Sequence, residues 1–154
     1  MGKCIKIGLE SATMTDLDIS TDKARLDLDL VYRYLSEAST WAIGIPRATF
    51  ERSLEHSLCF GAYLGAQQVG FARVVSDFAT FGNLVDVFVL PDYRGRGYSK
   101  LLMEAVLAHP QLQGLRRMTL ATGDAHGLYA QYGFTAPARP QSLMERYFPD
   151  IYKQ

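Results

Sequence analysis

The feature that most constrains this chain is a run of three different patterns between Leu84 and Ala108. Residues 84–90 are almost entirely apolar and are bounded by Gly-Asn and Pro-Asp, which is typical of a strand buried on both faces. The segment Arg-Gly-Arg-Gly follows at 94–97, and from Tyr98 the apolar residues recur at helical spacing. The sequence therefore predicts a strand, a glycine-rich basic turn and a helix in direct succession.

The turn in this unit has the chemistry of an anion site. Gly95 and Gly97 let the backbone approach a ligand closely, and Arg94 and Arg96 add positive charge. The N–H groups at a helix start favour a phosphate or pyrophosphate. A dinucleotide-binding loop would need a third glycine where Lys100 stands, and the Gly-Lys of a P-loop is absent. Taken alone, the four residues would also fit a solvated basic turn.

Patterns on either side of this unit predict the other elements of the fold. Alternation, helical spacing and turn residues are the signals used. The predicted strands are 17–20, 58–64, 68–76, 117–121 and a last one at 143–147. The predicted helices are 27–38 with Asp27 as its cap, a second one from Pro46, and 125–132 with Asp124 as its cap. Residues 1–16 fit either a strand or a loose extension.

Composition narrows the class of protein. The chain has 154 residues, 48% of them hydrophobic, which suits one domain over 1–154 with a sizeable core. Sixteen basic and sixteen acidic residues give no net charge, so nothing favours nucleic acid or a membrane surface. The N-terminus lacks a signal-peptide core. Cys4 and Cys59 have neither metal nor disulfide spacing, so we expect reduced thiols, no metal and a cytoplasmic protein.

Two motifs in this chain resemble those of the GNAT superfamily of acyl-CoA N-acyltransferases. Arg94 to Ser99, after the Val-Leu-Pro at 89–91, is similar to motif A, [Q/R]-x-x-G-x-[G/A], although Ser99 replaces the usual Gly or Ala. About 30 residues on, 122–134 resembles N-x-x-A-x-x-L-Y-x-x-x-G-F, with Thr122 in place of Asn. The matching residues are Ala125, Leu128, Tyr129, Gly133 and Phe134.

The resemblance, strongest over 58–134, implies a fold class. It is an α+β fold, an α/β/α sandwich around a mixed, mainly antiparallel sheet splayed at the cofactor cleft. About six or seven strands and about four helices are expected. The implied activity is transfer of the acetyl group of acetyl-CoA to a primary amine of a small molecule or peptide, by direct attack in a ternary complex. A non-catalytic acyl-CoA-binding or regulatory module on the same fold is the alternative, and a homodimer stays open.

The resemblance also implies residues for the cofactor site. The pyrophosphate would bind the N–H groups of the turn, and a backbone N–H near Val89 would polarise the thioester carbonyl. Tyr129 would protonate the departing thiolate, since a phenol of pKa about 10 is protonated at neutral pH. The helical stripe that contains Tyr129 also fits a core residue. The expected cofactor-binding residues are Phe88, Val89, Leu90, Arg94, Gly95, Arg96, Gly97, Tyr98, Ser99, Thr122 and Tyr129.

Two further residues are candidates for the acceptor side. Asp86 is a carboxylate within an apolar strand, which is costly unless it is paired or functional, so it is the leading candidate for a base or an amine ligand. Its alternative is an ion pair with Arg73 of the neighbouring strand. Trp41 lies in the connector between the first two helices and would form a wall of the acceptor pocket, or else fill a hydrophobic gap.

Overall fold

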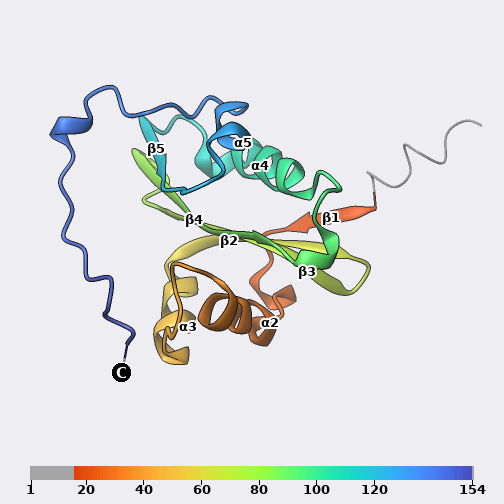
Figure 1. Ribbon diagram of the computed structural model, residues 1–154. Helices are drawn as coiled ribbons and strands as arrows, with labels where there is room; N and C mark the ends of the chain where they lie inside the picture. The colour runs from red at the N-terminus through yellow and green to blue at the C-terminus, as the bar shows by residue number, and fades with distance from the viewer. Residues whose placement is uncertain (1–15, 154) are drawn as a thin grey trace, which may run out of the picture.

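A five-stranded sheet organises the computed structural model, which describes residues 16–153 (Figure 1). The strands lie in chain order, with β1–β4 antiparallel and β5 parallel to β4. Their bounds are β1 Leu17–Ser20, β2 Ser57–Leu64, β3 Gln67–Ser76, β4 Phe81–Val89 and β5 Arg117–Leu120. The predicted mixed, mainly antiparallel sheet is confirmed, but six or seven strands is wrong for these residues. Predictions for 1–15 lie outside them.

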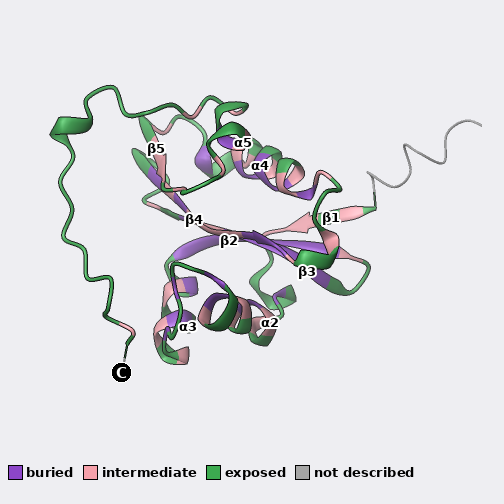
Figure 2. Ribbon diagram, viewed as in Figure 1, coloured by how far each residue is buried: buried purple, intermediate pink, exposed green. Residues whose placement is uncertain are grey.

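Helices cover both faces of the sheet, as expected for a sandwich (Figure 1). One face carries α2 (Leu28–Arg33) and α3 (Arg47–Glu55), and the other carries α4 (Tyr98–Ala108) and α5 (His126–Ala130). Each helix layer closes its own hydrophobic cluster against β2, β3 and β4. The three central strands are buried on both faces, which explains their nearly continuous apolar sequences (Figure 2).

The helix predicted over 27–38 is two kinds of helix. Asp27 caps α2 as expected, because its carboxylate accepts a hydrogen bond from the Leu30 N–H at 3.1 Å. From Tyr34 to Ala38 the helix widens into a π-helical turn, closed by a 2.8 Å bond from the Ser39 N–H to the Tyr34 carbonyl. Apolar spacing alone does not distinguish the two.

A bulge interrupts the β3–β4 ladder at Asp86. Arg73 pairs with Val85 and Phe71 with Phe88, so two residues of β4 stand opposite one residue of β3. Asp86 has a φ of 57°, which is uncommon for a residue with a side chain. The ladder between β4 and β5 ends at Leu84, so the second half of β4 has no partner on that side. This is the predicted splay.

The chain beyond α5 differs from the prediction. The strand expected at 143–147 is wrong, because these residues are exposed and pair with no described strand. We call residues 135–153 the C-terminal arm. Its first part, up to Leu143, holds one short 3₁₀ turn, Pro140–Ser142, and lines a hollow together with β5 and α5. The chain then runs away from the body before Tyr152 returns to the α2–α3 layer (Figures 1 and 2). No helix within 16–153 is long and apolar enough to cross a bilayer.

Candidate active site

The basic turn adopts a conformation suited to an anion. Gly95 and Gly97 have φ values of 77° and 81°, and Gly97 is the N-cap residue of α4. A Cβ at either glycine would meet nothing within 4 Å, so the need for glycine is conformational and not a matter of space. A hollow of about 260 Å³ lies against this turn and the start of α4, whose first N–H groups are available to a phosphate.

The two arginines of the turn do different things. Arg94 points back toward the sheet, where its Nε donates to the Val89 carbonyl at 2.9 Å and an Nη donates to the Tyr34 hydroxyl at 3.0 Å. Arg96 stays exposed, with its guanidinium 5.3 Å from the centre of the Tyr93 ring. An Nη of Arg96 also donates to the Asp92 carbonyl at 3.4 Å. Arg96 is therefore an exposed cation of the turn, whereas Arg94 joins the turn to β4 and to the helix on the opposite face.

The end of β4 presents backbone groups toward the splay. The Leu90 N–H donates to the Val69 carbonyl at 2.8 Å, so Leu90 faces β3. Strand alternation then turns the N–H of Val89 to the other side, where no described strand pairs with it. The Phe88 ring points into the α2–α3 layer and stacks on Tyr34 with 3.9 Å between ring centres. The Phe88 side chain is therefore engaged on the α2–α3 face of the sheet.

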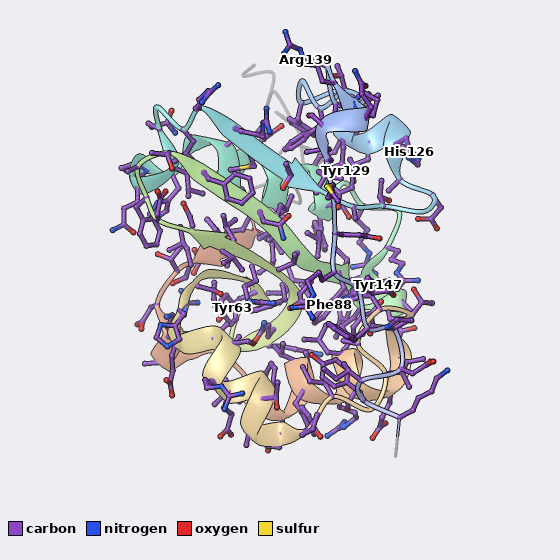
Figure 3. All side chains as sticks on the ribbon, turned by 90° about the vertical axis from the view of Figure 1, so that its left-hand side faces the viewer. Tyr63, Phe88, His126, Tyr129, Arg139 and Tyr147 are labelled. Carbon is purple, nitrogen blue, oxygen red and sulfur yellow. The ribbon has the colours of Figure 1, made fainter. Side chains whose placement is uncertain are left out.

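Tyr129 is placed beside the C-terminal end of β5, with which it lines a common hollow (Figure 3). The ring is buried and packs edge-on against Phe134, 6.0 Å between centres. Burial, followed by the charge of Asp124, raises the pKa of the Tyr129 hydroxyl above its usual value. No hydrogen bond to a described residue occupies that hydroxyl. The Tyr129 ring is thus part of the hydrophobic core, and its protonated hydroxyl makes no hydrogen bond to a described residue.

The residues before α5 are arranged differently from the prediction. Thr122 accepts a hydrogen bond from the Ala125 N–H at 3.0 Å through its side-chain oxygen, and Ala125 is the cap position. Asp124 as the helix cap is therefore wrong. Tyr98 is buried within the α4 layer, so its side chain serves the core, while Ser99 is half-buried at the hollow of the turn.

On the opposite face, Asp86 is held by two partners. One carboxylate oxygen accepts from the Arg73 Nε at 2.9 Å, and the other accepts from the Trp41 indole N–H at 2.8 Å. The Asp86 and Arg73 side chains are only 10% and 15% exposed. The ion pair that was the alternative reading of Asp86 is present. The Trp41 bond was not predicted, and it fixes a ring that is half-exposed.

Tyr34 is the residue of this site that sequence reasoning missed. It stacks on Phe88 and bonds to Arg94, so it links the α2–α3 face of the sheet with the basic turn. Its position between Tyr32 and Leu35, off the periodic apolar face of the predicted helix, gave no signal. No group of three or more potential metal ligands occurs among residues 16–153.

Comparison with known proteins assigns this arrangement. The family profile described as Acetyltransferase (GNAT) domain matches residues 55–136, more than half of the chain. This chain belongs to the GNAT family of acetyltransferases. The recognition made from the two motifs is confirmed, and the protein is an acyltransferase.

Several relatives agree with the GNAT assignment. A proposed GNAT acetyltransferase from Xanthomonas campestris pv. campestris, a crystal structure, is 61% identical, with a TM-score of 0.88 over 90% of this chain and 97% of that one. A proposed acetyltransferase of Gibberella zeae is 31% identical over 77% of this chain and 78% of its own. An acetyltransferase predicted in Clostridium acetobutylicum, solved with acetyl-CoA, shares the fold at 14% identity and a TM-score of 0.63, over 85% and 96% of the two chains.

Proposed function

We propose that this GNAT enzyme transfers the acetyl group of acetyl-CoA to a primary amine of a small molecule or peptide, by direct attack within a ternary complex. The observation that carries the proposal is a succession of two features. Only four residues separate the Val89 N–H, which pairs with no described strand at the splay, from the turn at 94–99, which suits an anion. One extended ligand with a thioester at one end and a pyrophosphate further along would meet both.

The donor would be held by backbone groups. The pyrophosphate accepts from the N–H groups at the start of α4, with Arg96 adding charge. The pantetheine arm lies along the open side of β4 and pairs with it as an added strand would. The side-chain oxygen of Thr122 already accepts a hydrogen bond from the Ala125 N–H. The lone pair used in that bond is therefore not free to contact the pantetheine arm.

The thioester carbonyl would be polarised by the Val89 N–H. A fixed backbone donor of this kind is worth about 3 kcal/mol of transition-state stabilisation. The Arg94 Nε donates to the Val89 carbonyl at 2.9 Å, and this hydrogen bond fixes the orientation of Val89. Arg94 therefore acts as a positioning residue for the donor site and does not itself contact the phosphates.

Tyr129 would supply the proton that the departing thiolate needs. Its hydroxyl is protonated at neutral pH, its pKa is raised further by burial, and no described residue competes for its hydrogen. The balance of the step is simple. The amine nitrogen forms a bond to the acetyl carbon, the carbon–sulfur bond breaks, and the proton of Tyr129 passes to sulfur before solvent replaces it.

On the acceptor side, we propose that Asp86 acts through Trp41. Both oxygens of the carboxylate already accept hydrogen bonds, one from the Trp41 indole and one from the Arg73 guanidinium. Such a group holds the half-exposed indole in place better than it removes a proton from an amine. Trp41 and Tyr34 then form one wall of the acceptor pocket, and the attacking amine loses its proton to water.

The test is steady-state release of CoA from acetyl-CoA over a panel of amines and peptides. Acetylation of at least one amine well above the rate of hydrolysis is expected. Calorimetry without an acceptor measures acetyl-CoA binding separately. Tight binding with no transfer to any amine would contradict the amine acceptor, and absence of binding would contradict the donor.

A further inference from the structure

Tyr34 contacts the donor side of the proposed site from the opposite face of the sheet. Its hydroxyl accepts a hydrogen bond from an Nη of Arg94 at 3.0 Å, and its ring stacks on Phe88 with 3.9 Å between ring centres. Phe88 lies toward the α2–α3 layer and away from Tyr129 (Figure 3). The same arginine donates to the Val89 carbonyl at 2.9 Å. A side chain of the α2–α3 layer is thus bonded to the segment that would hold the donor.

The backbone of Tyr34 also holds the connector that carries Trp41. The Tyr34 carbonyl accepts a hydrogen bond from the Ser39 N–H at 2.8 Å. Ser39 is buried, and its hydroxyl accepts from the Ala42 N–H at 3.0 Å and donates to the Leu35 carbonyl at 2.6 Å. Trp41 lies between Ser39 and Ala42 in the chain, so its backbone is placed by hydrogen bonds that begin at Tyr34.

The Trp41 side chain returns to the strand that holds the donor residue. Its indole N–H donates to Asp86 at 2.8 Å, and Asp86 lies three residues before Val89 in β4. The contacts therefore form a closed ring that leaves β4 through Arg94 and Tyr34 and comes back to it through Trp41. Arg94 makes none of the ion pairs found within 16–153, so its bonds to two neutral oxygens are what place its guanidinium.

We propose that Tyr34 is a positioning residue that transmits occupancy of the donor site to Trp41 in the wall of the acceptor pocket. This role rests on the proposed function, in which the thioester carbonyl of acetyl-CoA accepts from the Val89 N–H. That bond and the bond from Arg94 hold Val89 from both sides, and the restraint passes through Arg94 to Tyr34 and the connector. A segment already ordered by one ligand costs less to order for the next, so acetyl-CoA should favour acceptor binding, and the acceptor should favour acetyl-CoA.

The chain carries its own reporter of this coupling. Trp41 is the single tryptophan of the sequence, and its side chain is 51% exposed. The quenching of its fluorescence by acrylamide can therefore be measured before the acceptor is known. Saturating acetyl-CoA is expected to lower the acrylamide quenching constant of Trp41 about twofold, because an ordered connector gives the quencher less access to the indole.

Tyr34→Phe tests the hydroxyl alone, because the phenyl ring can keep its stack on Phe88. The variant should bind acetyl-CoA within about threefold of the parent by calorimetry, yet its quenching constant should no longer respond to the ligand. Tyr32→Phe is the matched control. The Tyr32 hydroxyl holds the same connector, donating to the Ile45 carbonyl at 2.9 Å, and makes no described hydrogen bond to the turn. Tyr32→Phe should keep the full response, whereas a merely structural role would not separate the two variants.

Arg94→Gln breaks the same contact from its other end and decides the question if Tyr34→Phe does not fold. It should also lose the response, with no further loss in the Tyr34→Phe/Arg94→Gln double variant. A response that persists in Tyr34→Phe would show that the ligand shields Trp41 directly and would overturn the role of Tyr34. Tight binding to the parent without any change in quenching would overturn it as well. Absence of acetyl-CoA binding to the parent would contradict the donor site itself, and the coupling with it.

Discussion

Replacing Asp86 by asparagine separates the contribution of Asp86 to stability from any contribution to catalysis. Asparagine keeps the shape, tolerates the φ of 57°, and retains an oxygen for the Trp41 indole or the Arg73 guanidinium. It removes the charge that balances Arg73. Removing one partner of a buried ion pair costs about 3–5 kcal/mol, and the remaining amide and the 2.9 Å bond from Arg73 to Ser57 reduce this to about 2–3 kcal/mol.

The assay has two readouts. A loss of about 2–3 kcal/mol lowers the melting temperature of a domain of this size by about 5–10 °C. Turnover per folded molecule, measured well below the transition, should stay within about tenfold because Asp86 acts through Trp41. Loss of a general base would cost about 10²- to 10⁴-fold. A stable variant with turnover reduced to that degree would refute the positioning role and return Asp86 to the role of base.

The control for this experiment is an exposed ion pair in the same chain. Asp18 and Arg25 are 2.7 Å apart, but their side chains are 60% and 39% exposed. Asp18→Asn should therefore lower the melting temperature much less than Asp86→Asn does, since solvent screens the pair. Equal losses at Asp18 and Asp86 would show that burial of the Asp86–Arg73 pair contributes nothing.

Four further predictions concern the donor side. Tyr129→Phe should lower kcat about 100-fold with little change in KM for acetyl-CoA, and a variant within twofold of the parent would leave water as the acid. Because the pKa of Tyr129 is raised, its deprotonation should not lower kcat below about pH 10. Ser99→Glu should preserve the fold, since a carboxylate suits a helix start, yet weaken acetyl-CoA binding at least tenfold by calorimetry; unchanged affinity would contradict the pyrophosphate site. Arg94→Gln loses the contacts to the Val89 carbonyl and Tyr34. We expect kcat to fall by a larger factor than the affinity for acetyl-CoA. A larger loss of affinity than of kcat would instead place Arg94 at the phosphates.

Sequence patterns predicted the elements of this fold whose conformation depends on residues close together in the chain. The buried strand, the glycine turn and α4 follow from apolar spacing and from glycine, and the β2–β3 hairpin follows from two β-rich runs around Gly65. Asp27 was recognisable as a cap because its partner is three residues away. The strand count came from the resemblance and was wrong for residues 16–153, because the arm extends where a further strand was expected.

The contacts that sequence reasoning missed all join distant segments. Nothing near Arg94 indicates that its side chain turns inward to Tyr34, 60 residues away, and nothing near Trp41 indicates a bond to Asp86. The bulge that directs Asp86 comes from one extra residue in β4, which alternation along a single strand cannot reveal. Cofactor contacts by the turn, the acid role of Tyr129 and a single domain over 1–154 stay predictions.

The π-helical turn at Tyr34–Ala38 bears on how the acceptor specificity of such an enzyme can diverge. One residue added to or removed from a helix rotates everything beyond it by about 100°. In this chain the wider turn lies between Tyr34, which stacks on Phe88, and the connector that carries Trp41, while the Ser39 hydroxyl still bonds to the Leu35 carbonyl at 2.6 Å. A relative one residue shorter here would keep the sheet and the donor turn yet show its acceptor a different side chain. A single-codon insertion or deletion in one helix is thus a route to a new acceptor that leaves acetyl donation untouched.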